Sequence, residues 1–513
     1  MRRFRRLPPL EPRLQSEALS DTEGTRLGRS IEQEAAARPG LSGIHLLADA
    51  HQAFAARILL ARAAERSLDV QYYIWRADLS GMLMLEALRE AADRGVRVRL
   101  LLDDNGIAGL DNLLAALDVH PMIEVRLFNP FFVRRPKALG YLTDFKRLNR
   151  RMHNKSFTAD SQATIIGGRN VGDEYFAARD GDLFADLDVL AIGAVVNDVS
   201  RDFDRYWNCA SAWPATRLLP VVGVEQLEEL AERSAAVHAD PRAHTYVETV
   251  RSLPFITHML DGSLPLVWTR VRMVSDDPAK VLDKARPGTS LGEQLQEAVG
   301  RPSREMALVS AYFVPTAAGV EAFAELSREK IKVSVLTNAL ESTDVAIVHA
   351  GYAKRREALI RAGVRLYEMR RPRAGTRRKR RLPLGVGGSA ARSVTGSILR
   401  SSGSMLHAKT FTVDRERLFV GSFNFDPRSV ALNTELGFVI ESPELAADVQ
   451  DAFESVIPMS AYEVTLSDKG RLRWIEREED GGEIEIHDVE PGTTRLQRLA
   501  IRVLSRLPIE WLL

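Results

Sequence analysis

Two short stretches of the chain carry the same reactive side chains at the same spacing. Residues 151–175 read RMHNKSFTADSQATIIGGRNVGDEY, and residues 406–429 read LHAKTFTVDRERLFVGSFNFDPRS. In each stretch a Lys stands two residues after a His, an Asp seven after it and an Asn seventeen after it: His153, Lys155, Asp160 and Asn170, and then His407, Lys409, Asp414 and Asn424. An imidazole that can carry a proton, beside a fixed ammonium, suits chemistry on phosphate groups.

The elements that must position these side chains can be predicted from the same two stretches. Each predicts a strand, a tight turn at residues 160–161 or 414–415, a second strand, and a turn at the small pair 167–168 or 421–422. Such a turn can expose backbone N–H groups to an anion. Residues two apart in a strand share a face, so we expect the His and Lys of each stretch to point the same way.

The repeated pattern resembles the signature of the phospholipase D superfamily, which is H-x-K-x4-D followed by small residues and an Asn, once in each half. One such match arises by chance in long chains, but two matches, each extended by an Asn, are far more specific. The likeness runs from about residue 43 to about residue 459. The segments LDVQYYIW, GVRVRLLLDDN, IIGGRNVGDEYF and LPIEWLL are most similar to bacterial cardiolipin synthases of the C type.

A phosphodiester reacts only when its oxygens are neutralised, a nucleophile is supplied and the leaving oxygen is protonated. One imidazole can attack phosphorus while the other donates and later accepts a proton. We expect the phosphoryl oxygens to be held by Lys155, Lys409, Asn170, Asn424 and Ser422. Two ammonium groups supply the positive charge and no carboxylate cluster accompanies them, so we expect neither a metal nor another cofactor.

The resemblance implies a phosphohistidine mechanism in which His153 is the nucleophile and His407 the acid and base. Asp186 and Glu435 begin the later apolar segments DLDVLAI and ELGFVI and match the positions that orient the histidines in the family. The alternative for both is a charged strand edge. Asp160 and Asp414 belong to the catalytic signature, but at a turn an Asp side chain is expected to hold backbone N–H groups.

The chain from residue 43 predicts an α/β fold, because short apolar strands alternate with helices. Strands are expected at 44–47, 68–75, 96–102 and 123–128, helices at 52–66, 80–94 and after 109, and the strands of the second half at 271–274, 307–313, 331–336 and 364–367. We expect a largely parallel sheet in each half. The repeat predicts two similar phospholipase D-like lobes with mostly parallel or mixed sheets flanked by helices, related by pseudo-two-fold symmetry, with one active site at their interface.

The expected domain organisation follows from this repeat. It comprises an N-terminal arm (1–42) with a short helix at 30–37, a first lobe (43–213), a connecting segment (214–264) with a helix at 224–236, a second lobe (265–460) with a basic insert (370–400), and a C-terminal extension (461–513). Residues 131–151 are basic and predict either a solvated loop or a wall of the phosphate pocket. Eight of the twelve residues at 370–381 are basic, which favours either a solvated loop or contact with anionic lipid headgroups, with nucleic acid as a third alternative.

The C-terminal extension predicts an amphipathic helix. Its two stripes are Arg495, Arg498, Arg502 and Arg506 on one side and Leu496, Leu499, Val503, Leu504 and Leu507 on the other. Such a helix suits either a membrane interface or docking on its own protein. No apolar run reaches the roughly 18 residues of a spanning helix, so we expect a peripheral protein. The sequence leaves open a signal or lipid-attachment segment upstream of Met1.

The function implied by the resemblance is cardiolipin synthesis, in which a phosphatidyl group passes from phosphatidylethanolamine or phosphatidylglycerol to phosphatidylglycerol. The expected location is the cytoplasmic face of the bacterial inner membrane. The alternatives are hydrolysis by a phospholipase D, a nuclease, and a lipid-binding scaffold without catalysis. Because 70 Lys and Arg residues nearly balance 69 Asp and Glu residues, we expect no nucleic-acid partner. The sequence does not determine the oligomeric state.

Overall fold

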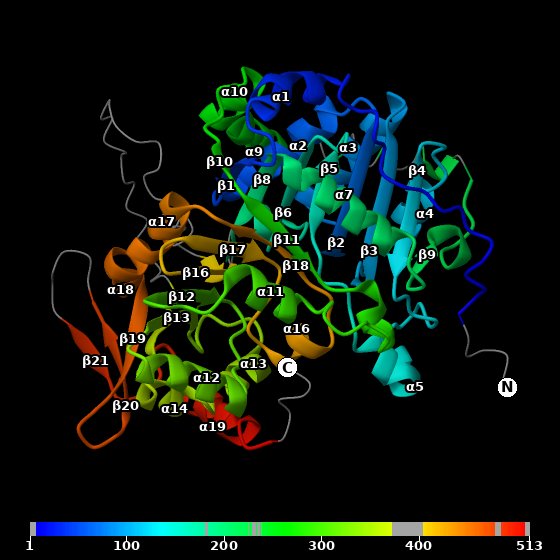
Figure 1. The fold of residues 1–513 in the computed structure, drawn as a ribbon. Coiled ribbons are helices and arrows are strands. Elements are labelled where there is room, and N and C mark those ends of the chain that lie inside the picture. The colour runs from blue at the N-terminus through cyan, green and yellow to red at the C-terminus, as the bar shows by residue number, and fades with distance from the viewer. Residues whose placement is uncertain are drawn as a thin grey trace.

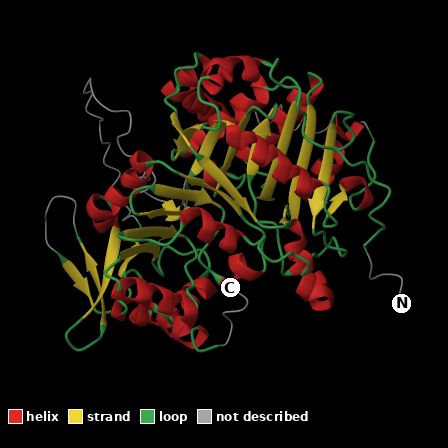
Figure 2. Cartoon of the chain, in the orientation of Figure 1, coloured by secondary structure: helices red, strands yellow, loops and turns green. Residues whose placement is uncertain are grey.

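The chain folds into two lobes, each built on one large sheet (Figure 1). The computed structural model describes residues 7–179, 183–223, 225–227, 232, 236, 239–371, 404–477 and 484–507. Figure 2 shows helices packed over both sheets and the strands of the two sheets running in different directions. The basic insert falls largely at 372–403, outside the described residues, as does most of the helix expected at 224–236.

The first lobe contains a nine-stranded sheet in the order β10-β1-β8-β6-β5-β2-β3-β4-β9. Its strands are β1 (Ser42–Leu47), β2 (Ser67–Ile74), β3 (Arg97–Gly106), β4 (Ile123–Phe128), β5 (Ser156–Ala159), β6 (Ala163–Gly167), β8 (Asp188–Gly193), β9 (Ala212–Pro214) and β10 (Val267–Thr269). Only the pairs β2–β3 and β3–β4 are parallel.

The second lobe contains a ten-stranded sheet in the order β11-β18-β17-β16-β12-β13-β14-β19-β20-β21. Its strands are β11 (Val271–Ser275), β12 (Glu305–Ser310), β13 (Lys332–Asn338), β14 (Arg365–Met369), β16 (Lys409–Val413), β17 (Arg417–Gly421), β18 (Leu436–Ile440), β19 (Ala461–Leu466), β20 (Leu472–Glu476) and β21 (Glu485–His487). Apart from β10, β20 and β21, the two strand orders are the same, so the predicted duplication is confirmed.

The sheets are mixed, and the expectation that each would be largely parallel was wrong. Each sheet has two parallel pairs, and antiparallel strands make up the rest. The reason is that each reactive stretch forms a hairpin, β5–β6 or β16–β17, and a hairpin needs only a two-residue turn instead of a helical crossover. The predicted tight turns are present, with left-handed backbone at Asp160 (φ 51°) and Ser161 (φ 51°) and again at Asp414 (φ 56°) and Arg415 (φ 58°).

Helices cover the sheets and connect most of their strands. In the arm, the first lobe and the connecting segment they are α1 (Arg26–Ala36), α2 (Ala50–Ala63), α3 (Leu79–Asp93), α4 (Asp111–Leu117), α5 (Ala138–Leu148), α6 (Asp173–Phe176), α7 (Ala194–Trp207), α9 (Pro241–Arg251) and α10 (Pro254–Leu260). Those of the second lobe are α11 (Leu291–Val299), α12 (Ala317–Arg328), α13 (Ala346–Ala353), α14 (Arg356–Arg361), α16 (Pro427–Ala431), α17 (Pro443–Ser455), α18 (Ile457–Ser460) and α19 (Arg495–Leu504).

Three segments differ from the sequence-based expectations. Residues 131–151 do not form a loop throughout, because α5 forms there, with Leu139, Leu142 and Phe145 on the surface. The connecting segment continues as α9 and α10, both of which begin with a Pro at a first-turn position, where a missing N–H costs no helical bond. Strand β10 joins the first sheet and β19 to β21 extend the second, so the sheets reach beyond the expected lobe boundaries.

An apolar core joins the two lobes. Strands β1, β6 and β8 of the first sheet contribute Ile44, Ile166 and Val189 to one cluster with Val420 and Phe438 of the second sheet, and all five side chains are buried. Burying large side chains from both lobes stabilises their contact by about 1.5–3 kcal/mol for each fully buried side chain. The lobes are therefore fixed relative to one another, as a site shared between them requires.

Candidate active site

His153 stands at the contact between the lobes, immediately after an isolated bridge between Met152 and Thr434. Its backbone N–H donates to the carbonyl oxygen of Thr434 at 2.8 Å. Its Nδ1 atom lies 2.8 Å from Oε2 of Glu435, the next residue of the second lobe. A histidine of the first lobe is therefore oriented by a carboxylate of the second.

His407 repeats this arrangement with the lobes exchanged. Strand β15 (Ser404–Leu406) pairs with β7 (Leu183–Ala185) of the first lobe, and the His407 N–H donates to the carbonyl oxygen of Ala185 at 2.8 Å. Its Nδ1 atom lies 2.5 Å from Oδ2 of Asp186. Glu435 thus directly follows Thr434, which is bonded to His153, and Asp186 directly follows Ala185, which is bonded to His407.

This exchange determines which ring nitrogen is available in each imidazole. An ionised carboxylate only accepts hydrogen bonds, so Nδ1 of each histidine carries the hydrogen that it donates. The neutral ring then presents an unprotonated Nε2, which is the atom a nucleophile or base needs. Asp186 and Glu435 were both expected from the sequence to orient histidines, and the geometry assigns each of them to the histidine of the other lobe.

The two lysines lie beside the histidines in a buried site. Nζ of Lys155 donates to the carbonyl oxygen of His153 at 2.5 Å, and Lys409 makes the same bond to His407. Burial lowers the pKa of Lys155 to about 7, against the opposing effect of Glu435. Burial also lowers the pKa of Lys409, against the opposing effect of Asp186. These ammonium groups lack water around them, so an incoming anion would be strongly favoured.

The imidazoles are shifted in the same direction. Burial lowers the pKa of His153 to about 4, although Glu435 opposes the shift. Burial lowers the pKa of His407, and the neighbouring charge of Lys409 lowers it further. In the free protein at neutral pH both rings are therefore neutral. A bound phosphodiester would add negative charge beside them and raise both pKa values, which makes protonation of one ring accessible.

The two carboxylates differ in what else they bind. Oε2 of Glu435 accepts from the Ser422 hydroxyl at 2.5 Å, and Oε1 accepts from the Ser429 hydroxyl at 2.9 Å. Asp186 instead faces Gly168, where an added Cβ would come within 2.1 Å of Oδ1, and accepts from its neighbour's N–H. Burial alone would raise the pKa of Asp186, but His407 and Lys409 hold it well below its usual range.

The two asparagines of the repeated pattern are used differently. Asn170 is held by the protein, since its Oδ1 accepts from the N–H of Ile74 at 3.1 Å and its Nδ2 donates to the Tyr175 hydroxyl at 3.0 Å. Asn424 is equally buried, but its Oδ1 has no hydrogen-bond partner among the described residues. The amide of Asn424 can therefore turn toward a ligand without losing a bond at that oxygen.

The aspartates of the signature lie at the other end of their strands, away from the histidines. Oδ1 of Asp160 accepts from the N–H groups of Arg66 at 2.8 Å and Ser67 at 2.9 Å, where β2 begins. Asp414 does the same with the N–H groups of residues 303–305 at the start of β12. Both side chains tie a hairpin turn to the neighbouring strand, which is a structural task, and the N–H groups they bind are not those of the turn itself.

Two positioning residues were missed by the sequence reasoning. Oδ2 of Asp103 accepts from the N–H of Met152 at 2.8 Å, and Oδ1 of Asn338 accepts from the N–H of Leu406 at 3.0 Å. Met152 and Leu406 directly precede the two histidines, so each clamp fixes the backbone that carries an imidazole. The available signal was a polar residue ending an apolar strand in both halves, in LLLDDN and in VLTN.

Aromatic side chains surround the imidazoles. Tyr73 meets His153 edge to face with ring centroids 5.1 Å apart, and Tyr175 meets His407 in the same way at 5.2 Å. Phe184 lies 5.0 Å from His407. Such rings pack against the imidazoles and limit the access of water to them.

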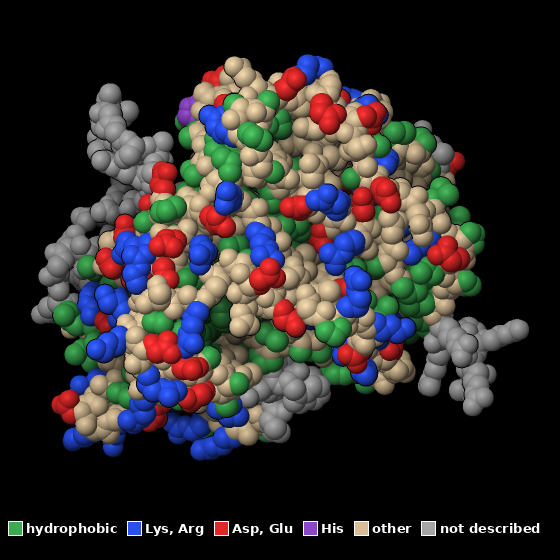
Figure 3. Space-filling model, in the orientation of Figure 1, with side chains coloured by type: hydrophobic (Ala, Val, Ile, Leu, Met, Phe, Trp, Pro, Cys, Tyr) green, Lys and Arg blue, Asp and Glu red, His purple; other side chains and the backbone are tan. Residues whose placement is uncertain are grey.

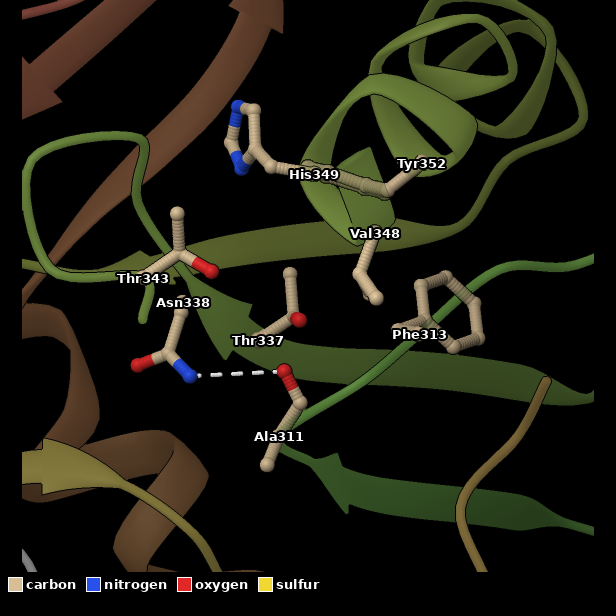
Figure 4. A pocket seen from close by; sticks show the side chains of 8 residues that line it. All are labelled: Ala311, Phe313, Thr337, Asn338, Thr343, Val348, His349 and Tyr352. Carbon is tan, nitrogen blue, oxygen red and sulfur yellow. Dashed lines mark hydrogen bonds between the residues drawn. The ribbon is translucent and has the colours of Figure 1, made fainter. Parts of the chain in front are cut away.

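A small pocket lies behind Asn338, at the end of β13 (Figure 4). It is lined by Ala311, Phe313, Thr337, Asn338, Thr343, Val348, His349 and Tyr352. Nδ2 of Asn338 donates both to the carbonyl oxygen of Ala311 at 3.3 Å and to that of Leu406 at 2.9 Å. The pocket wall is therefore bonded to the residue that precedes His407.

Residues with metal-ligand chemistry gather elsewhere. In the described part of the chain, the one group of three His, Cys, Asp or Glu side chains that could share an ion is Glu476, Glu485 and His487, on β20 and β21. Glu476 is already paired with Arg370 at 2.6 Å. At the histidine site, two cationic lysines beside the imidazoles would repel a metal ion. The absence of a metal requirement stays a prediction.

Comparisons with known proteins agree with this geometry. A family model described as "Cardiolipin synthase, PLD-like domain" matches residues 58–207 and 293–457. Cardiolipin synthase C of Escherichia coli is 48% identical over 95% of this chain and 100% of its own length. An uncharacterized protein of Helicobacter pylori is 31% identical over 93% of this chain and 91% of its own. The crystal structure of phosphatidylserine synthase from Haemophilus influenzae shares the fold, with a TM-score of 0.57, 12% identity, and coverage of 95% of this chain and 100% of that one.

Proposed function

The chain belongs to the cardiolipin synthase family of PLD-like domain proteins, and we propose that its interface site transfers a phosphatidyl group from one phospholipid to the glycerol hydroxyl of another. The observation that carries the proposal is the pair of exchanged contacts, His153 with Glu435 and His407 with Asp186. They leave Nε2 of each imidazole without a carboxylate partner, beside two buried ammonium groups, of which Lys409 Nζ lies 3.4 Å from Nε2 of His407. This arrangement suits a phosphodiester and two successive proton transfers.

In the first step Nε2 of His153 attacks phosphorus and the bond from phosphorus to the headgroup oxygen breaks. The imidazolium of His407 gives its proton to that oxygen, so the headgroup leaves as an alcohol and not as an alkoxide. Lys155, Lys409 and the Asn424 amide hold the phosphoryl oxygens. The products are a phosphatidyl-histidine and a neutral His407.

In the second step the hydroxyl of the acceptor lipid gives its proton to Nε2 of His407. Its oxygen attacks phosphorus, and the bond from phosphorus to His153 breaks. His153 returns to its neutral form and His407 is again protonated, so the cycle is balanced without a cofactor. Water attacking in place of the acceptor would give phosphatidic acid.

The unequal surroundings of the carboxylates support the assignment of roles. Glu435 shares its charge among the His153 ring and two serine hydroxyls, which suits an imidazole that stays neutral until it attacks. Asp186 directs its charge at His407, which suits an imidazole that must hold a proton. On this basis Ser422 and Asn170 position the site, whereas the sequence had suggested that both bind phosphate.

The family supports a proposal for the substrates and the location. We propose phosphatidylglycerol as acceptor, phosphatidylethanolamine or a second phosphatidylglycerol as donor, and peripheral association with the cytoplasmic face of the bacterial inner membrane. No helix among the described residues is long and apolar enough to cross a bilayer. Figure 3 shows acidic and basic side chains interspersed over one face, a pattern that gives nucleic acid no extended basic track there.

The decisive experiment supplies the purified protein with phosphatidylglycerol and phosphatidylethanolamine that carry different isotopic labels. We expect mass spectrometry to find cardiolipin with one phosphatidyl group from each labelled pool, in excess over phosphatidic acid. Phosphatidic acid as the sole product would make the protein a hydrolase. Cleavage of DNA without action on lipid would make it a nuclease, and no product from any diester would leave a lipid-binding scaffold.

A further inference from the structure

Helix α5 presents apolar side chains to solvent at the edge of the first lobe. Leu139 is 50% exposed, Leu142 82% and Phe145 41%. Figure 1 shows α5 projecting from the lower edge of the lobe. A helix that held its lobe together would turn these residues inward, so this apolar face is available to another surface.

Helix α19 does the same on the second lobe. Ile501 is buried and Leu504 partly buried against Leu340 and Ala350, so the helix is docked on its own protein. Four further apolar side chains stay exposed: Leu496 at 78%, Leu499 at 55%, Val503 at 52% and Leu507 at 44%. The two alternatives drawn from the sequence are therefore compatible, because docking uses only one side of the helix.

The charge of α19 is uniformly basic. Residues 495–507 contain four Arg and no Asp or Glu. Within the described residues, Arg495, Arg502 and Arg506 are exposed and take part in no ion pair. Figure 3 shows Lys and Arg side chains gathered along the lower edge of the molecule, over the position of α19. Unpaired guanidinium groups beside an exposed leucine face complement a surface that is apolar inside and anionic outside.

A third helix, α16, carries an exposed apolar residue close to the active site. Val430 of α16 is 61% exposed, and α16 begins three residues after Asn424. Arg428 of α16 donates to the carbonyl oxygen of Asn149 at 2.8 Å, at the end of α5. In all, eight of the fifteen exposed large hydrophobic residues of the described chain lie on or beside α5, α16 and α19. Figure 1 places these three helices along the lower part of the molecule and α10 at the top.

Helix α5 is also connected to the nucleophile. The hydroxyl of Tyr141, on α5, donates to Oδ1 of Asn105 at 3.1 Å, and Nδ2 of Asn105 donates to the Tyr73 hydroxyl at 3.3 Å. Tyr73 packs edge to face on His153. A surface in contact with α5 is therefore connected to the His153 imidazole through the side chains of Tyr141, Asn105 and Tyr73.

We propose that α5, α16 and α19 form one docking face, and that this face lies on a bilayer containing anionic phospholipid, with the active site opening toward the lipid headgroups. The inference rests on the proposed function, since a transfer between two lipids needs both to reach one site. Docking in this orientation delivers donor and acceptor from the same plane. The apolar side chains enter the boundary between headgroups and acyl chains, and the arginines of α19 meet lipid phosphates.

The test compares three variants with the wild-type protein: Leu139→Glu with Leu142→Glu on α5, Leu496→Glu with Leu499→Glu on α19, and Leu260→Glu on α10 as the control. Leu260 is 73% exposed and lies outside the proposed face. Cosedimentation is measured with phosphatidylglycerol vesicles and with phosphatidylcholine vesicles. Transfer activity is measured separately on a short-chain phosphatidylglycerol below its micelle concentration.

We expect the wild type and the control to bind phosphatidylglycerol vesicles in preference to phosphatidylcholine vesicles. Each double variant should partition about ten-fold more weakly. All four proteins should retain activity on the short-chain lipid. Equal vesicle binding by all four would overturn the docking face, as would a dimeric wild type that the double variants convert to monomers, because the covering surface would then be a second copy. Vesicle binding without activity on any lipid would instead refute the proposed function and leave the docking face intact.

Discussion

Asp186 of the first lobe lies 2.5 Å from Nδ1 of His407 in the second lobe. Glu435 of the second lobe stands in the same relation to His153 of the first. Each half of the chain therefore supplies a histidine that only the other half can orient. Two motifs that could have formed two separate sites instead form one.

The exchange predicts that Asp186→Asn lowers kcat by about 10²–10³-fold with little change in KM. The amide can still accept from Nδ1–H, but it no longer stabilises the imidazolium that protonates the leaving group. The measurement is steady-state kinetics beside Asp198→Asn, an exposed control on α7. A kcat within about two-fold of the wild-type value would mean that Asp186 does not assist His407 and is only a charged strand edge.

A trapping experiment should distinguish the roles of the two histidines. His153→Ala should form no covalent phosphatidyl-protein, because the nucleophile is gone, whereas His407→Ala should form it slowly and also release it slowly. The measurement is acid-quenched labelling with radioactive phospholipid followed by gel analysis. Label on His153→Ala and none on His407→Ala would exchange the two roles.

Deprotonation of Lys155 should contribute to the alkaline limit of the reaction. Its pKa is lowered to about 7 by burial, so the free protein loses this positive charge as the pH rises through 7, and kcat/KM for an anionic phosphodiester should fall there. On the acid side, protonation of the nucleophile should not limit kcat/KM until the pH falls toward 4, because burial lowers the pKa of His153 to about 4. The measurement is a pH profile on a soluble short-chain lipid. An alkaline limb only near the ordinary lysine pKa of about 10 would contradict the shift of Lys155, and an acid limb near the ordinary histidine pKa of about 6.5 would contradict that of His153.

Asp160 should matter for stability more than for chemistry. Asp160→Ala leaves the N–H groups of Arg66 and Ser67 without their acceptor, and we expect the free energy of unfolding to fall by about 2–4 kcal/mol. At temperatures well below the melting temperature, the variant should keep the wild-type activity per folded molecule. Denaturant unfolding and kinetics at low temperature separate the two effects. A stable but inactive variant would place Asp160 in the catalytic step.

Activity should survive EDTA, because the charges that neutralise the phosphodiester belong to Lys155 and Lys409. The measurement is transfer activity after dialysis against chelator, with and without added Mg²⁺, Ca²⁺ or Zn²⁺. Loss of activity that a divalent ion restores would remove this assignment.

The sequence alone determined the duplication, the hairpins and the identity of the reactive side chains. These depend on local spacing: a His and a Lys two residues apart share a strand face, and the turn residues between two short strands close a hairpin wherever they occur. Asp186 and Glu435 could be expected for the same reason, because they recur after both motifs.

Only the tertiary structure decided how these parts are paired. Asp186 and His407 are 221 residues apart in sequence, and nothing in the spacing indicates that each carboxylate serves the other lobe. The same holds for the clamps at Asp103 and Asn338, and for the exposed face of α5, whose leucines could equally have been buried. Strand patterns specify which side chains share a face, whereas the meeting of two faces depends on the apolar core that fixes one lobe against the other.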